Sequence, residues 1–141
     1  MAILGVDQVS VAVASLEDAS RIYERILGLR RRGKDETVAD QGVTTRFFPV
    51  ADTLSVVEAL LPTGPDTPVG KFLEKRGPGV HHIAFRVDNL DQELARLKAL
   101  GVRLIDETPR KGAEGKRIAF LHPKETGGVL IELCEAGAGH A

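Results

Sequence analysis

The chain has 141 residues, of which 43% are hydrophobic and 28% are charged, so a single globular domain or two small halves around a shared core is expected. Its net charge of −1 argues against a basic surface for nucleic acid, and no run of residues is apolar and long enough to span a bilayer. The first residues lack the basic segment and cleavage motif of a signal peptide, and the single cysteine, Cys134, excludes an internal disulfide. A cytoplasmic protein with no nucleic-acid or membrane partner is therefore predicted.

The first half of the chain is predicted to hold one helix and four strands. Val9, Val11 and Val13 alternate with polar or small residues, which is typical of a strand with one apolar face. Apolar residues then recur at helical spacing between Ser15, which suits a helix start, and Gly28, which suits a helix end. The expected elements are a strand at 6–13, a helix at 16–27, a weak strand near 29–36 and strands near 43–50 and 55–61.

Proline and glycine are concentrated at 62–79, which indicates a linker between two halves. A short helix at 68–76 is expected within it, because Thr67 can cap such a helix and Pro68 suits its first position. The second half repeats the order of the first. Its expected elements are a strand at 80–87, a helix at about 90–100 between Asn89 and Gly101, a strand near 102–106, a polar loop at 109–116, strands at 117–121 and 128–134, and a frayed end at 136–141.

Each half therefore has the order β-α-β-β-β, and the predicted fold class is α+β. Two such modules, at 6–62 and 80–135 with a linker at 63–79, are expected to form one domain over 1–141. Their strands would make a curved, partly closed mixed sheet around a metal site. The helices would lie outside, and one face of each strand would line the inner surface.

The two halves are related by a constant offset of 74 residues, which places Val80 opposite Val6 and continues along both strands. The same offset places His82 opposite Gln8 and Glu132 opposite Glu58. Four side chains that can bind metal therefore fall at two pairs of equivalent positions.

A carboxylate inside an apolar strand is costly to bury unless it is paired or bound to a metal. Two carboxylates at matched positions, together with an imidazole and an amide oxygen, suit one divalent metal ion whose open positions could bind a substrate. The alternative is that Gln8, Glu58, His82 and Glu132 are ordinary polar residues on the wet face of a sheet.

Three further positions are candidates for other roles. His81 must point away from the face of His82, and we expect it to be structural. Lys116 belongs to a basic, glycine-containing segment that could bind the phosphate of a cofactor, although a solvated loop is an equally good interpretation. His122 precedes Pro123 in a predicted turn and is a candidate for contact with a substrate.

Five motifs resemble one known family. They are Gln41-Gly42-Val43, Pro62-Thr63-Gly64-Pro65-Asp66-Thr67-Pro68-Val69-Gly70-Lys71-Phe72-Leu73, Gly79-Val80-His81-His82-Ile83-Ala84-Phe85, Gly115-Lys116-Arg117-Ile118-Ala119-Phe120-Leu121-His122-Pro123-Lys124 and Gly127-Gly128-Val129-Leu130-Ile131-Glu132-Leu133. Over nearly its whole length the chain resembles the methylmalonyl-CoA epimerases of the vicinal-oxygen-chelate, or glyoxalase-like, superfamily. The resemblance implies paired β-α-β-β-β modules, a divalent metal such as Co²⁺ or Zn²⁺, an acyl-CoA substrate and a homodimer.

The resemblance also implies an isomerase that interconverts (2R)- and (2S)-methylmalonyl-CoA by proton transfer at C2 through a metal-stabilised enolate. Glu132 is then both a metal ligand and one acid/base group. We expect Glu58 to be the second such group, on the opposite side of the metal. Thr45 occupies the position of a catalytic glutamate in many bacterial relatives, so a water held by Thr45 is a competing hypothesis. The substrate-binding residues expected are Thr45, Lys116 and His122.

Gln8 departs from the family, in which a histidine usually follows the aspartate at this position. The resulting ligand order Gln-Glu-His-Glu is similar to that of zinc-type glyoxalase I, the lactoylglutathione lyase, which is therefore one alternative function. A non-catalytic ligand-binding module of the same fold is another alternative.

Overall fold

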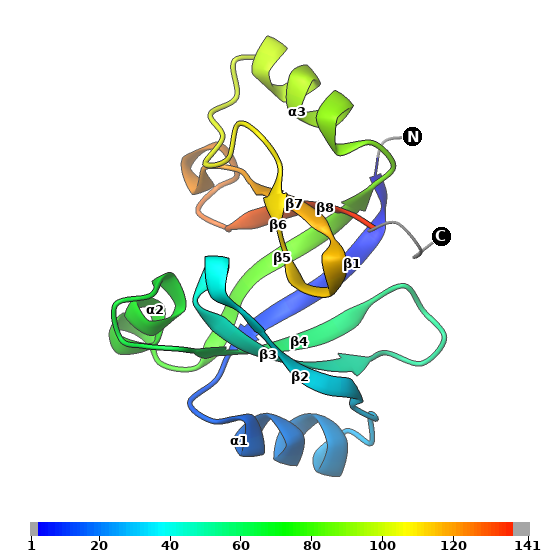
Figure 1. Cartoon of the computed structure of the whole chain (residues 1–141), viewed down its shortest axis with the longest axis vertical. Coiled ribbons are helices and arrows are strands. Elements are labelled where there is room, and N and C mark those ends of the chain that lie inside the picture. Colours follow the sequence, from blue (N-terminus) through cyan, green and yellow to red (C-terminus); the bar gives the residue numbers. More distant parts are fainter. Residues whose placement is uncertain (1–2, 137–141) are drawn as a thin grey trace. The chain divides into compact units, whose positions relative to one another are not determined.

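The computed structural model describes residues 3–136, drawn in colour in Figure 1. The predicted frayed end at 136–141 lies outside this range except for its first residue. Contacts divide the chain into two compact units. The first unit is Gln8–His81, and the second unit comprises the described residues on either side of it. None of the helices in this part of the chain is long and apolar enough to cross a membrane.

The first unit holds a four-stranded sheet with a helix packed on one face (Figure 1). Its elements are the end of β1 (Ile3–Ala12), α1 (Leu16–Ser20), the π-helical turn η1 (Arg21–Ile26), β2 (Arg32–Val38), the 3₁₀ turn η2 (Ala39–Gln41), β3 (Val43–Pro49), β4 (Val56–Pro62) and α2 (Pro68–Arg76). Strands β2, β3 and β4 are antiparallel, and β4 is parallel to β1. Leu16 and Ala19 of α1 pack on Phe48 and Ala59, which forms the core of this unit.

The second unit has the same order of elements and begins within β5 (Gly79–Val87), at His82. Its elements are β5, α3 (Leu90–Ala99), β6 (Arg110–Lys111), the 3₁₀ turn η3 (Ala113–Gly115), β7 (Arg117–Phe120), the 3₁₀ turn η4 (Pro123–Glu125) and β8 (Ile131–Glu135). Strand β5 is parallel to β8, whereas β8, β7 and β6 are antiparallel. Leu90 and Leu94 of α3 are buried with Ala119 and Leu133 of the sheet. Among the described residues, the hydrogen-bonded order is β2-β3-β4-β1 in the first unit and β5-β8-β7-β6 in the second.

The predicted helix starts are confirmed by their capping hydrogen bonds. The side chain of Ser15 accepts from the backbone N–H of Asp18, at 3.1 Å. Asn89 caps α3 in the same way, and Thr67 caps α2, which spans the predicted residues 68–76. The segment predicted as one α-helix at 16–27 is α-helical only in its first part. After α1 it continues as the π-helical turn η1, and the N–H of Leu27 donates to the carbonyl of Ile22 at 3.0 Å.

The strand predicted near 102–106 is wrong, since this segment makes one isolated bridge between Leu104 and Leu121. The cause is Asp106, whose carboxylate accepts the N–H of Phe120 at 2.9 Å and so takes a donor that a strand ladder would use. The predicted polar loop at 109–116 contains the short strand β6 instead. In addition, β2 begins and ends later than the predicted strand at 29–36.

Gly70 of α2 offers a test of the packing in the first unit. A Cβ atom at Gly70 would lie 2.4 Å from the carbonyl oxygen of Gly64 and 2.9 Å from that of Pro65, and neither backbone atom can move away cheaply. We therefore expect Gly70→Ala to lower the free energy of unfolding by about 1–3 kcal/mol, although alanine normally favours a helix. Gly79→Ala is the control, because its Cβ would meet nothing within 4 Å. Urea denaturation of both variants checks this, and equal stability would contradict it.

Candidate active site

Glu58 is a buried carboxylate in the first unit, with 4% of its surface exposed. It lies on β4 directly opposite Ser10 of β1. Its Oε1 atom accepts two hydrogen bonds, from the amide nitrogen of Gln8 at 2.9 Å and from the hydroxyl of Ser10 at 2.7 Å. Hydrogen bonds to an ionised carboxylate are strong, so these two donors offset the cost of burying it.

His82 and Glu132 form the corresponding pair in the second unit. The Nε2 atom of His82 lies 3.2 Å from the Oε2 atom of Glu132, and both side chains are 3% exposed. The imidazole also contacts Phe120 edge-on, with ring centroids 5.1 Å apart. Phe120 stands opposite Glu132 on the neighbouring strand β7, so it closes one side of the pair with an apolar wall.

Strand register confirms the repeat detected in the sequence. In the first unit, Ser10 of β1 is the parallel partner of Glu58 in β4. In the second unit, Ala84 of β5 is the parallel partner of Glu132 in β8. Ala84 is 74 residues after Ser10, as Glu132 is after Glu58. The two carboxylates therefore occupy the same place in two equivalent strand pairs.

The four predicted ligands are brought together as two pairs, one in each unit. Each pair joins a carboxylate to a second side chain whose oxygen or nitrogen can bind a metal, and all four side chains are buried. Imidazole nitrogen and carboxylate or amide oxygen are ligands suited to Zn²⁺ and Co²⁺, so the donor chemistry fits a divalent ion. Within residues 3–136, no three His, Cys, Asp or Glu side chains lie close enough together to bind one metal ion.

Lys116, a predicted substrate-binding residue, is engaged in a buried ion pair. Its ammonium group lies 2.7 Å from Oδ1 of Asp7, and the Nε atom of Arg86 lies 2.7 Å from Oδ2 of the same carboxylate. Burial would raise the pKa of Asp7, but the hydrogen bonds and charges of Lys116 and then Arg86 outweigh it, so this pKa lies below its ordinary value of 3.8. Sequence reasoning did not identify Asp7 and Arg86, although Arg86 is in phase with His82 along β5.

Burial also raises the pKa of the nearby Cys134 thiol far above its ordinary value. The negative charges of Asp7 and Glu132 raise it further. This thiol therefore stays protonated and is a poor nucleophile, as expected for a buried structural cysteine.

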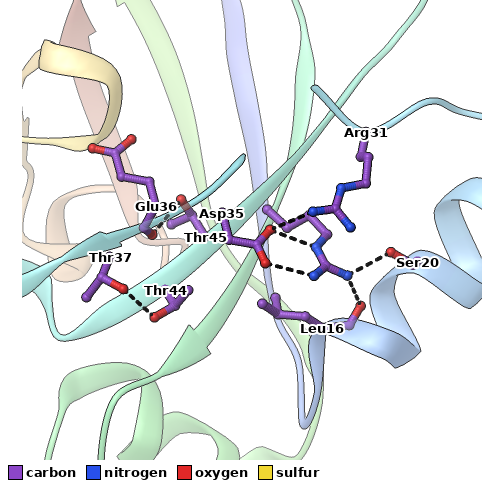
Figure 2. Close-up of polar contacts among 9 residues, drawn as sticks. Leu16, Ser20, Arg31, Asp35, Glu36, Thr37, Thr44 and Thr45 are labelled. Carbon is purple, nitrogen blue, oxygen red and sulfur yellow. Dashed lines mark hydrogen bonds and ion pairs between the residues drawn. The ribbon is translucent and has the colours of Figure 1, made fainter. Parts of the chain in front are cut away.

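Thr45 lies on β3, and its hydroxyl donates to the backbone carbonyl of Glu36 at 3.2 Å (Figure 2). It is 1% exposed and stands opposite Glu36 on β2 and Leu60 on β4.

The next residue, Arg46, binds both carboxylate oxygens of Asp35 at 2.8 Å. The remaining bonds of this guanidinium group, drawn in Figure 2, go to the carbonyl of Leu16 and the hydroxyl of Ser20. The strand that carries Thr45 is thus tied to α1.

His81 and His122, the two other histidines of the motifs, each make local contacts of their own. The ring of His81 meets Phe72 edge-on, with centroids 5.0 Å apart. His122 accepts the backbone N–H of Lys124 through Nδ1, at 3.2 Å. It also lines an open surface pocket of about 500 Å³, together with the cationic side chains of Lys98 and Arg103.

Comparison with known proteins identifies the family. Residues 7–120 match the model of the Glyoxalase/Bleomycin resistance protein/Dioxygenase superfamily. The ethylmalonyl-CoA/methylmalonyl-CoA epimerase of Cereibacter sphaeroides is 38% identical over 129 residues, which is 90% of this chain and 94% of that protein.

Solved structures agree with this match. The crystal structure of methylmalonyl-CoA epimerase from Mycobacterium tuberculosis has a TM-score of 0.91 and 40% identity, covering 96% of this chain and 89% of that chain. A methylmalonyl-CoA epimerase in complex with methylmalonyl-CoA and NH₄⁺ has a TM-score of 0.90 and 36% identity, covering 96% of both chains.

The chain belongs to the glyoxalase/bleomycin resistance protein/dioxygenase superfamily. The relative and the two solved structures described above are methylmalonyl-CoA epimerases, and the first of them is also an ethylmalonyl-CoA epimerase. The predicted resemblance, the α+β fold class and the assignment to the isomerases are therefore confirmed.

Proposed function

We propose that this protein interconverts the (2R) and (2S) epimers of methylmalonyl-CoA by moving the proton at C2. The observation that carries the proposal is the pair of buried carboxylates, Glu58 and Glu132, at equivalent positions in the two repeats. Epimerisation removes a proton from one face of a carbon atom and returns one to the other face, so it needs two acid/base groups. The names of the similar proteins and the acyl-CoA bound in one of them support the same substrate.

The proton transfer is proposed to run between these two groups. For one epimer, the carboxylate of Glu132 takes the proton from C2, and the electron pair moves into the thioester to give an enolate. Glu58, in its carboxylic acid form, then returns a proton to the opposite face of C2. The roles reverse for the other epimer, because the reverse reaction passes through the same enolate.

We also propose that Gln8, Glu58, His82 and Glu132 hold one divalent ion, Co²⁺ or Zn²⁺. When bound, the ion would polarise the thioester carbonyl and stabilise the negative charge that develops there. The amide nitrogen of Gln8 donates to Glu58, so rotation of this amide would present its oxygen as the ligand atom. Supporting this proposal are the donor chemistry of both pairs and the equivalence of their positions.

The remaining parts of the proposal concern substrate contacts and assembly. Thr45, Lys116 and His122 are proposed to position the acyl-CoA. Lys116 would do so while paired with Asp7, and His122 beside the cationic pocket that it lines. We further propose a homodimer, which the resemblance to the epimerases implies. We also propose a cytoplasmic location, which the single cysteine supports.

The function is tested with one pure epimer of methylmalonyl-CoA and a coupling enzyme that consumes the other epimer. We expect the purified, metal-loaded protein to sustain product formation in this assay. Methylglyoxal with glutathione is the parallel substrate, because the Gln-Glu-His-Glu set is similar to that of glyoxalase I. Turnover of methylglyoxal and glutathione without turnover of methylmalonyl-CoA would indicate a glyoxalase I instead of an epimerase. Binding of acyl-CoA without either reaction would indicate a non-catalytic ligand-binding module.

Metal removal is expected to abolish the reaction. Elemental analysis of the purified protein should find one divalent ion per chain, and exhaustive chelation should lower the epimerisation rate by about 100-fold or more. Addition of Co²⁺ or Zn²⁺ should restore it. Full activity in protein without stoichiometric metal would contradict the proposed ligand set, as would two ions per chain, one for each pair.

A further inference from the structure

The two carboxylates have the same place in the repeat but are held by different groups. Opposite Glu58 stands Ser10, which is 0% exposed and donates its hydroxyl proton to Oε1 at 2.7 Å. Opposite Glu132 stands Ala84, which is equally buried and has no side-chain donor. The second group of Glu132 is instead the imidazole of His82, at 3.2 Å.

The Ser10 hydroxyl acts on the orientation of the Glu58 carboxylate. Ser10 and Gln8 both donate to Oε1 in this structure. The Ser10 bond is the one that remains when the Gln8 amide turns its oxygen to the proposed ion. A hydrogen bond of 2.7 Å, made by a side chain that is itself 0% exposed, restricts the rotation of the carboxyl group about its last bond. Proton transfer depends steeply on such alignment, because the oxygen must meet the carbon-bound proton at close range.

We propose that Ser10 is a positioning residue for Glu58 and that its hydroxyl makes the two proton-transfer groups unequal. The inference rests on the proposed function, in which Glu58 serves one face of C2 and Glu132 serves the other. Loss of the hydroxyl impairs the group on one face alone. The consequence is a defect that depends on which epimer is supplied.

Solvent-deuterium exchange reports this defect directly. Each pure epimer is incubated in D₂O with Ser10→Ala, and two products are measured: the inverted epimer, and the starting epimer that has gained deuterium at C2. For the epimer whose proton Glu132 removes, the enolate still forms, but return from Glu58 is slow. Glu132 then returns solvent deuterium to the original face, so exchange without inversion rises about tenfold relative to inversion.

For the other epimer, Glu58 must remove the proton, so both rates fall. The enolate is then protonated by Glu132 more often than by Glu58, so exchange without inversion falls about tenfold relative to inversion. This ratio does not depend on the fraction of protein that is folded, so lower stability cannot imitate the result. Ser10→Thr keeps the hydroxyl and should restore the wild-type ratio. The matched control is Thr44→Ala, which removes a hydroxyl that lies 2.9 Å from Thr37 in the same unit.

A wild-type ratio for both epimers in Ser10→Ala would overturn the inference, and so would a change of both ratios in the same direction. Inversion by the wild-type protein in the same experiment tests the proposed function separately. If the wild type inverts neither epimer, the proposed function fails. If it inverts both and Ser10→Ala leaves both ratios unchanged, the role of Ser10 alone is refuted.

Discussion

Replacement of Glu58 by glutamine is expected to slow the inversion of methylmalonyl-CoA by a factor of about 10²–10⁴, the usual contribution of a positioned acid/base group. The amide keeps the size of the side chain and can still accept the hydrogen bonds of Gln8 and Ser10, which the carboxylate accepts at 2.9 and 2.7 Å. It cannot take or return the proton at C2. Glu132→Gln should cause a loss of the same order, because Glu132 has the equivalent position in the second repeat. The measurement is the rate of inversion for each pure epimer.

Metal content must be determined in the same preparations, since either change removes a proposed ligand. Glu93→Gln is the matched control, because Glu93 is also a buried carboxylate, at 5% exposure, but is bonded to Arg96 within α3. This variant should invert both epimers at close to the wild-type rate. If Glu58→Gln retains full inversion with the metal still bound, Glu58 is not an acid/base group of the reaction.

Replacement of Lys116 by methionine is expected to lower the free energy of unfolding by about 3 kcal/mol at pH 7. Methionine keeps an unbranched apolar stem but removes the ammonium group that lies 2.7 Å from Asp7. The carboxylate of Asp7 is 1% exposed and would retain Arg86 as its partner. One of the two cationic groups that offset the cost of burying its negative charge would therefore be lost. Urea denaturation measures the loss.

The effect of Lys116→Met should depend on pH in a defined direction. The pKa of Asp7 in the folded protein lies below 3.8, so the ion pair contributes fully above that pH. Its contribution is lost as the pH falls through the lowered pKa, and the difference in stability between wild type and variant should shrink there. Arg117→Met is the control, because the Arg117 side chain is 45% exposed and its pairing with Asp91 should contribute less than about 1 kcal/mol. Equal losses in the two variants would contradict the account.

The repeat was the most informative feature of the sequence. A constant offset between the two halves predicts that equivalent residues have equivalent partners on the neighbouring strands. It placed Glu58 and Glu132 at matched positions, and the strand pairs β1–β4 and β5–β8 have that register. Caps were also predictable, since Thr67 and Asn89 act through residues three positions away. Local patterns of this kind are fixed by the spacing along one element.

Pairings between distant residues could not be predicted in this way. Lys116 and Asp7 are 109 positions apart, and nothing in the basic segment around Lys116 indicates that its charge is buried. The absent strand near 102–106 has a similar cause, because it depends on Asp106 capturing a backbone donor of Phe120. Ser10 was visible in the sequence as a polar residue on the same strand face as Gln8. Its proposed role depends on the residue that faces it, Glu58, which only the register between β1 and β4 reveals.

The most direct test of the central claim is the reaction of one pure epimer of methylmalonyl-CoA with the metal-loaded protein in D₂O. We expect formation of the opposite epimer with deuterium at C2, at a rate that falls steeply in both Glu58→Gln and Glu132→Gln. If protein that holds its metal produces no inverted epimer, or if inversion is unchanged when both carboxylates are replaced, the account is wrong.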